Sequence, residues 1–169
     1  MAAKLAFREG LRVRERQPAW CGVTPHYARL EIRARMELSP RSMASVWLAG
    51  IEDEPQRSGE ICVFEIFGDA LDGAASAAVG MGIKHFRDPG LRWDFEAPRL
   101  AIDVREPHDY AADWHPDRVE FSVDGELVRT VAQAPGYPMQ FMLAVFDFQS
   151  KPDPRDHEPL FAVDRVRAD

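Results

Sequence analysis

Apolar and polar side chains in this chain follow strand periods, and turn signals separate the strands. Between residues 27 and 36 every second residue is apolar and most of the others are charged, the pattern of a strand with one face on a core. Residues 139–148 are apolar on both faces, which favours a central strand. No stretch of useful length has a helical period.

We expect about eleven short strands. The clearest lie at 27–36, 43–49, 59–68, 77–84, 100–104, 108–114, 119–131, 139–148 and 160–167, with a short edge strand at 11–16. The stretch 119–131 is predicted to be a hairpin, because Asp124-Gly125 supplies the positive φ values that a type I′ turn needs. Many short strands with turns between them predict an all-β sandwich.

Length and charge narrow the class of protein further. The 169 residues suit one domain, 1–169, with an irregular N-terminal segment at 1–26. A net charge of −7 without a basic run argues against nucleic acid as a partner. The N-terminus has no apolar core of a secretory signal and no run has membrane-spanning length. We therefore expect no membrane partner, and either a cytoplasmic location or one that this stretch of chain does not specify.

The stretch 59–68 is the most informative one, because it is apolar and bounded by glycines yet contains two carboxylates. In a regular strand Glu60 and Cys62 share one face, while Glu65 falls on the other. The two cysteines of the chain, at 21 and 62, form no disulfide framework and no zinc-ligand cluster.

A β-bulge near Val63 or Phe64 would change the faces, because it opposes two residues to one on the neighbouring strand. Glu65 then returns to the face of Glu60 and Cys62. Retaining glycosidases hold their two carboxyl groups about 5–5.5 Å apart, so a bulged strand suits a double-displacement site. The alternative is an ordinary half-buried strand whose glutamates face solvent.

Several runs resemble glycoside hydrolase family 16, the laminarinase and lichenase group. They are SVWLAG at 45–50, EICVFE at 60–65, HDYAADW at 108–114, VEFSVDG at 119–125, YPMQ at 137–140 and FAVDRVR at 161–167. These runs follow the family's order from about Tyr27 onward. The resemblance implies a concanavalin A-like jelly-roll β-sandwich that acts on polysaccharide or oligosaccharide.

The family's active strand has the pattern Glu-x-Asp-x-x-Glu. The resemblance therefore implies that Glu60 is the nucleophile and Glu65 the acid/base in a retaining endo-hydrolysis of β-glucan, with β-1,3 or mixed linkage. Cys62 stands where the family has the supporting Asp, and a neutral thiol should support the carboxylates poorly. A carbohydrate-binding module or pseudoenzyme on the same fold is the alternative, and a fragment that needs association is a third.

Candidate substrate-binding residues are aromatic or polar side chains near the expected cleft. They are Trp47, His85, Trp93, Tyr110, Trp114 and Gln140. Aromatic rings can stack on the apolar face of a sugar, and core packing is the competing interpretation. His85 stands at a strand end where the family often has a cleft histidine, and a surface histidine is the alternative. Gln140 interrupts an apolar run and can bond a sugar hydroxyl if it faces the cleft.

The resemblance also raises the questions of missing strands and of a metal. Relatives generally have more strands before the position of Tyr27, so an N-terminally incomplete sandwich could expose an edge that pairs with another chain. Asp164 matches a position that helps to bind a structural calcium in many relatives. One Asp cannot supply the six to eight oxygens that calcium takes, so we predict no cofactor and no metal.

Overall fold

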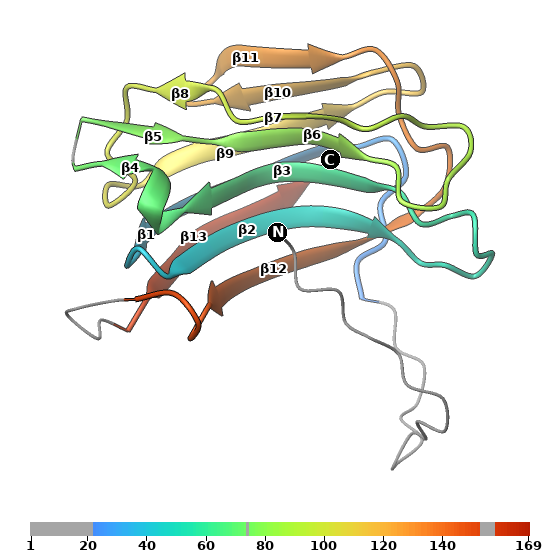
Figure 1. The fold of residues 1–169 in the computed structure, drawn as a ribbon. Coiled ribbons are helices and arrows are strands. Elements are labelled where there is room, and N and C mark those ends of the chain that lie inside the picture. The colour runs from blue at the N-terminus through green and yellow to red at the C-terminus, as the bar shows by residue number, and fades with distance from the viewer. Residues whose placement is uncertain (1–21, 74, 153–157) are drawn as a thin grey trace, which may run out of the picture.

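The computed structural model describes residues 22–73, 75–152 and 158–169. They form two five-stranded antiparallel sheets that pack face to face, with a small third sheet at one end (Figure 1). The one helix among them is the short 3-10 turn Gly68–Ala70. None of these residues forms a helix that is long and apolar enough to cross a membrane. The predicted all-β sandwich is confirmed.

The sheet that carries the candidate residues is called the cleft sheet here. Its strand order is β12 (Met139–Asp147), β2 (Ser42–Gly50), β3 (Glu60–Phe67), β6 (Gly80–Lys84) and β7 (Asp94–Glu96). Its two faces differ, since one packs on the second sheet and the other faces out. The strand with both glutamates, β3, is the middle one.

The second sheet is called the outer sheet. Its order is β11 (Glu126–Val131), β10 (Val119–Val123), β9 (His108–Trp114), β1 (Arg29–Glu37) and β13 (Leu160–Ala168). The small sheet consists of β4 (Leu71–Asp72), β5 (Ser76–Ala78) and β8 (Arg99–Leu100). The first and the last described strands, β1 and β13, are neighbours in the outer sheet.

The core lies between the two large sheets. Every second residue of β1 from Leu30 to Met36 is buried, as the alternation predicts. From the cleft sheet, Ile61 and Ile66 are fully buried. The Phe64 ring packs on the Tyr110 ring of the outer sheet, with 4.5 Å between the ring centroids. Aromatic packing therefore joins the two sheets at the centre of the sandwich.

Most predicted strands are confirmed, although the one at 77–84 is divided into β5 and β6. At the hairpin turn, Asp124 and Gly125 have φ values of 51° and 80°, as a type I′ turn requires. The strand predicted at 100–104 is reduced to β8, because the Asp103 carboxylate accepts hydrogen bonds from the backbone and guanidinium of Arg105 and forms a turn. The edge strand predicted at 11–16 lies outside the described residues.

The prediction of a central strand at 139–148 is wrong for the described part of the chain, because β12 is an edge strand. The outer sheet ends beside it at β13 (Figure 1). Apolar side chains of both edge strands are partly exposed, including Leu143 (47%), Val145 (41%), Val163 (37%) and Val166 (43%). β12 and β13 are therefore edge strands of the described sheets, and the N-terminally incomplete sandwich stays a prediction.

The hydroxyl of Tyr137 fixes the start of β3. It accepts a hydrogen bond from the backbone N–H of Gly59 (2.8 Å) and donates one to the Asp88 carboxylate (2.7 Å). Tyr137 and Asp88 are each only 9% exposed. Removal of the hydroxyl would leave a buried N–H and a buried carboxylate oxygen without this partner.

We expect Tyr137→Phe to lower the free energy of unfolding by about 1–3 kcal/mol, the usual cost of an unsatisfied buried group. Urea unfolding would measure the change. The matched control is Tyr27→Phe, which removes a hydroxyl from a 39% exposed side chain and should change stability little. Equal effects of the two substitutions would contradict this role of Tyr137.

Candidate active site

The predicted bulge is present in β3. On the side of β2, Val46 pairs with Phe64 and Trp47 pairs with Cys62, so Val63 has no partner. The pairing of β3 with β6 is irregular over the same stretch. One extra residue on β3 is the definition of a bulge, and it reverses the alternation of faces beyond it.

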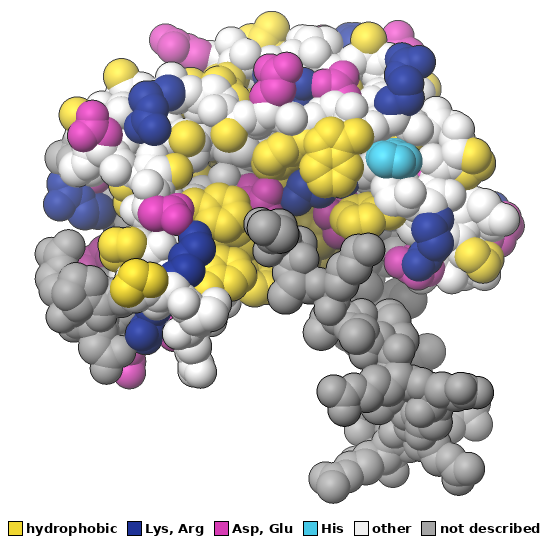
Figure 2. All heavy atoms as spheres, in the orientation of Figure 1, with side chains coloured by type: hydrophobic (Ala, Val, Ile, Leu, Met, Phe, Trp, Pro, Cys, Tyr) yellow, Lys and Arg dark blue, Asp and Glu magenta, His cyan; other side chains and the backbone are white. Residues whose placement is uncertain are grey.

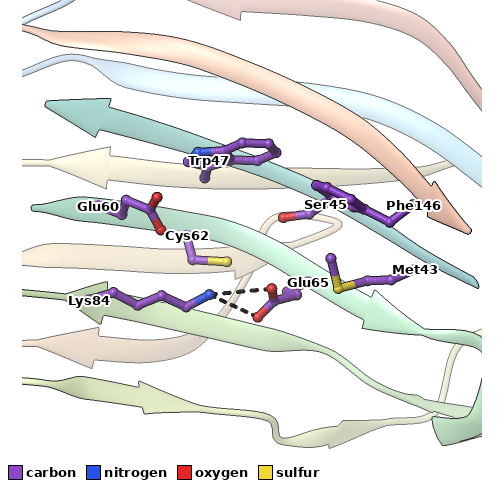
Figure 3. Close-up of a pocket in the computed structure, with 8 residues that line it drawn as sticks. All are labelled: Met43, Ser45, Trp47, Glu60, Cys62, Glu65, Lys84 and Phe146. Atoms are coloured by element: carbon purple, nitrogen blue, oxygen red, sulfur yellow. Dashed lines mark hydrogen bonds and ion pairs between the residues drawn. The ribbon is translucent and has the colours of Figure 1, made fainter. Parts of the chain in front are cut away.

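The bulge brings Glu60, Cys62 and Glu65 to one face of the sheet. All three line the same pocket, and the close-up shows their side chains on the same side of β3 (Figure 3). Ile61 and Ile66 point the other way and are fully buried. The predicted arrangement of the strand is confirmed.

The carboxylate pocket is the hollow on the exposed face of the cleft sheet. Its lining consists of Met43, Ser45, Trp47, Glu60, Cys62, Glu65, Lys84 and Phe146. A second hollow, the side pocket, shares Glu60 and adds Ala49, Gly50, Glu52, Ser58, Phe86 and Arg87. We call the two together the cleft. The space-filling view shows this face, where hydrophobic side chains surround acidic and basic ones (Figure 2).

The loop that leads into β3 borders the cleft, as the sequence predicts. Glu52 and Ser58, from the two ends of this loop, line the side pocket. The Ser58 hydroxyl accepts a hydrogen bond from the backbone N–H of Arg87 (3.0 Å), and the Arg87 guanidinium pairs with Glu52. Two loops are therefore joined at this end of the cleft.

Lys84 is the charged residue that the sequence analysis missed. Its Nζ lies 3.0 and 3.3 Å from the two carboxylate oxygens of Glu65, and both side chains are about 15% exposed. The same Nζ lies 4.7 Å from the centroid of the Phe95 ring. Lys84 stands directly opposite Glu60 on the neighbouring strand, and the period of the strand at 77–84 could have placed it on this face.

The two glutamates of the pocket have different electrostatic surroundings. Burial raises the pKa of Glu60, the Glu65 charge raises it further, and the nearby Lys84 charge opposes both. Glu65 instead forms the buried ion pair with Lys84. A carboxylic acid that must donate a proton cannot at the same time hold an ammonium group as a carboxylate. The geometry therefore sets an ammonium group against Glu65, whereas burial raises the pKa of Glu60.

Cys62 lies between the two glutamates as a neutral thiol. It is 1% exposed, and burial is the main cause that raises its pKa far above the ordinary value. The thiol lies 4.0 Å from the backbone oxygen of Gly80, and a hydrogen bond with the Ser45 side chain opposes the rise of its pKa. It therefore provides neither a charge nor a strong hydrogen bond to either carboxylate.

Three predicted substrate residues lie on or beside the cleft face. Trp47 lines the carboxylate pocket, and its ring centroid is 6.3 Å from that of Phe146. Gln140 pairs with Ala49, which pairs with Glu60, so directly opposed residues place Gln140 on the same face. Trp93 is 56% exposed and lies beside Phe95 of β7.

His85 follows the last residue of β6, so it lies one position beyond the residue that reaches the pocket. Its ring is edge-on to that of Trp93, with 6.3 Å between the centroids. The Nδ1 atom is buried without a hydrogen-bond partner. His85 does not line either pocket. The lysine before it takes the place expected for the cleft histidine.

Tyr110 and Trp114 are corrections to the predicted substrate-binding set. Both belong to β9 of the outer sheet, and they are 0% and 2% exposed. Tyr110 packs on Phe64 in the core, and the Trp114 indole N–H donates to the backbone oxygen of Pro135 (3.1 Å). Neither ring has a free face for a sugar, so core packing explains both.

Metal ligands are not gathered anywhere in the described ranges, where no cluster of three or more His, Cys, Asp or Glu side chains could hold an ion. Asp164 lies in β13 with its Oδ2 4.0 Å from Nε of Arg33. An arginine beside this carboxylate supplies the positive charge that a cation would otherwise bring.

A β-sandwich with two glutamates on a bulged strand, at the floor of an open cleft, has the arrangement of a polysaccharide-cleaving glycosidase. Comparison with known families supports this class. Residues 23–152 match the family model of the glycosyl hydrolases family 16, and the chain belongs to that family. A search among curated proteins found no match.

Solved structures show the same fold at low sequence identity. A GlcNAcα1-4Gal-releasing endo-β-galactosidase from Clostridium perfringens matches with a TM-score of 0.72 and 24% identity, over 90% of this chain and 40% of that one. The catalytic domain of a laminarinase from Thermotoga petrophila matches with a TM-score of 0.70 and 20% identity, over 86% of this chain and 64% of that one. A Bacillus licheniformis β-glucanase matches with a TM-score of 0.63 and 20% identity, over 86% of this chain and 67% of that one. The match thus spans less than two thirds of the first two chains.

The high pKa of Glu60 predicts a dependence of stability on pH. A group whose pKa is higher in the folded chain than in the unfolded one stabilises the fold at low pH, and this contribution is lost as pH rises through the folded-state pKa. The free energy of unfolding of the wild type, relative to Glu60→Gln, should therefore fall as pH rises above the ordinary value of 4.5.

Urea unfolding of both proteins across the acidic and neutral range would measure this difference. Carbon-13 NMR of the Glu60 carboxyl group would show its titration directly. A difference between the two proteins that stays constant with pH, or that rises, would contradict the raised pKa.

Proposed function

We propose that this chain is a weakly active retaining endo-glycosidase that acts on a β-glucan with β-1,3 or mixed linkage. Glu60 attacks the anomeric carbon, and Glu65 protonates the leaving oxygen and then activates water. The observation that carries the proposal is the bulge at Val63, which brings both carboxylates into one pocket. The family supports glycan hydrolysis.

The cleft has a shape that suits a polymer. The side pocket continues from Glu60 past the end of the carboxylate pocket, so sugar units can lie on both sides of the carboxylates. Trp47 and Phe146 provide aromatic surface in the pocket, and Gln140 offers an amide on the same face. Aromatic stacking with a few polar contacts is the usual composition of a ligand site.

Two features make the activity weak. Cys62 replaces a group that could hydrogen-bond the nucleophile and add negative charge between the glutamates. Lys84 holds Glu65 as a carboxylate, whereas the first step needs a proton on Glu65. The Lys84–Glu65 pair must therefore open before Glu65 can donate a proton to the leaving oxygen.

The same ion pair favours a second candidate function, a carbohydrate-binding module that retains the cleft without turnover. In this function Lys84 and Glu65 are hydrogen-bonding groups for sugar hydroxyls. Reducing-sugar release from laminarin, lichenan, agarose and carrageenan, measured beside the binding of the same polymers, separates the two. Release that Glu60→Gln abolishes supports the enzyme, and binding without release supports the module.

Cys62→Asp should increase hydrolysis of the preferred β-glucan by about ten- to a hundredfold, because positioned acid/base groups act on a scale of about 10²–10⁴ and the fit is imperfect. Initial rates of reducing-sugar release would measure the gain. Glu60→Gln in the Cys62→Asp background is the control and should abolish it. A folded Cys62→Asp variant that binds the polymer and stays as slow as the parent would favour the binding module.

Lys84→Met should also increase hydrolysis, by about tenfold or more, because it removes the ammonium from Glu65 and keeps an apolar stem beside Phe95. The double variant with Cys62→Asp should be faster than either single variant. Lys151→Met is the matched control, since Lys151 pairs with Asp69 (2.7 Å) outside both pockets. A loss of polymer binding without a gain in rate would show that Lys84 contacts the sugar instead.

A further inference from the structure

Phe86 combines an exposed aromatic side chain with a strained backbone at the side pocket. Its φ is 45°, a left-handed value that bulky residues rarely adopt. The residue is 52% exposed, so core packing does not offset the cost of this conformation. Phe86 lines the side pocket together with Glu52 and Arg87. Backbone strain is often retained where it serves a ligand, and the pocket supplies a place for one.

The turn that contains Phe86 does not itself need a large side chain. The Asp88 backbone N–H donates to the His85 backbone oxygen (2.8 Å), which closes a four-residue turn over 85–88. Of its two central residues only Phe86 has a positive φ, as in a type II′ turn, where glycine is preferred at that position. Glycine would form this turn with less strain. The phenylalanine ring therefore needs an explanation outside the turn.

Contacts with the loop that leads into β3 hold this turn in place. The Arg87 backbone N–H donates to the Ser58 hydroxyl (3.0 Å), and its Nε donates to the backbone oxygen of Pro55 (3.1 Å). Its guanidinium pairs with Glu52, which also has a positive φ, of 57°. Strained residues of two loops are thus fixed to each other beside the side pocket. The position of Phe86 is set before any ligand arrives.

Tyr27 shows how ring packing can explain the same strain. Its φ is 58°, and its ring lies edge-on to that of Trp114, with 5.4 Å between the centroids. Tyr27 lines neither pocket. Phe86 has the same kind of backbone but lines a pocket that also contains Glu60. Packing accounts for Tyr27, and a ligand contact accounts for Phe86.

We propose that the side pocket is a subsite for one neutral sugar unit of the polymer and that the Phe86 ring stacks on this unit. Glu60 lines both pockets, so a polymer with one unit at the carboxylates can place the next in the side pocket. An aromatic ring suits the apolar face of a sugar. Glu52 and Arg87 supply an acceptor and donors for its hydroxyls. This role rests on the proposed function, since it takes the ligand of the cleft to be a sugar polymer.

Charge in the side pocket favours a neutral sugar over a sulfated one. The carboxylates of Glu52 and Glu60 both belong to its lining. Arg87, the cation of the described lining, is already paired with Glu52. A sulfate group would therefore meet acidic groups without a free cation to bind it, and the net charge of −7 adds to the repulsion.

Phe86→Gly separates a sugar contact from a structural role. Glycine adopts a positive φ at little cost, so the urea midpoint of unfolding should stay equal or rise. Laminarin binding, measured by isothermal titration calorimetry, should weaken by about fivefold, the scale of one aromatic stacking contact. Both proteins carry Glu60→Gln in this measurement, so that turnover does not affect it. Phe86→Tyr keeps an aromatic ring and should keep the binding.

Tyr27→Gly is the matched control, because it also replaces an aromatic residue of positive φ. It should lower the urea midpoint, since the ring packed on Trp114 is lost, and leave laminarin binding unchanged. Three results would overturn the role of Phe86: a lower urea midpoint for Phe86→Gly, unchanged laminarin binding by that variant, or an equal loss of binding in Phe86→Tyr.

The choice of polymer tests the neutral-sugar part. Carrageenan, which is sulfated, should bind about tenfold or more weakly than laminarin, because like charges oppose each other in the side pocket. Equal binding of the two polymers would overturn this part.

These binding measurements also stand apart from the test of the enzyme. A wild type that releases no reducing sugar, with laminarin binding that depends on Phe86, would reject the glycosidase and support the subsite. Release of sugar by the wild type, with binding that Phe86→Gly leaves unchanged, would reject the subsite alone.

Discussion

The extra residue in β3 is the constraint on which the site depends. Without the bulge at Val63, a regular strand would put Glu60 and Glu65, which are five residues apart, on opposite sides of the sheet, one of them in the core. Burial of a charged group among apolar residues would then cost several kcal/mol. The bulge lets the strand bury Ile61 and Ile66 and still present both carboxylates to the same pocket. Fold stability and site geometry therefore follow from one irregularity.

The electrostatic balance around that strand is set by its neighbour β6. Lys84 compensates the charge of Glu65, and this allows two acidic groups to share a pocket with little water. In the proposed mechanism this compensation acts against the chemistry, because Glu65, the proposed acid, is the carboxylate that is paired. The thiol of Cys62 cannot correct this balance.

Local patterns predicted the all-β class, most strands and the Asp124-Gly125 turn, since each depends on a few adjacent residues. The strand pattern alone left the bulge open beside an ordinary half-buried strand, and the resemblance to family 16 decided for the bulge. The pairing of Lys84 with Glu65 was missed because it depends on the register between two strands that are distant in sequence. Tyr110 and Trp114 were misplaced for the same reason: aromatic residues suit both a core and a sugar platform, and only the sheet order separates these uses. The apolar character of 139–148 predicted a neighbour on each side, which the described strands provide only for one.

The pairing of β1 with β13 has a consequence for how the chain reaches its structure. Leu30 lies opposite Ala168, so the outer sheet cannot be completed until nearly the whole sequence has been synthesised. Contacts between distant parts of a sequence slow folding, and the unpaired strands stay open to aggregation in the meantime. We therefore expect the first and last described strands of this domain to meet in a late step of folding.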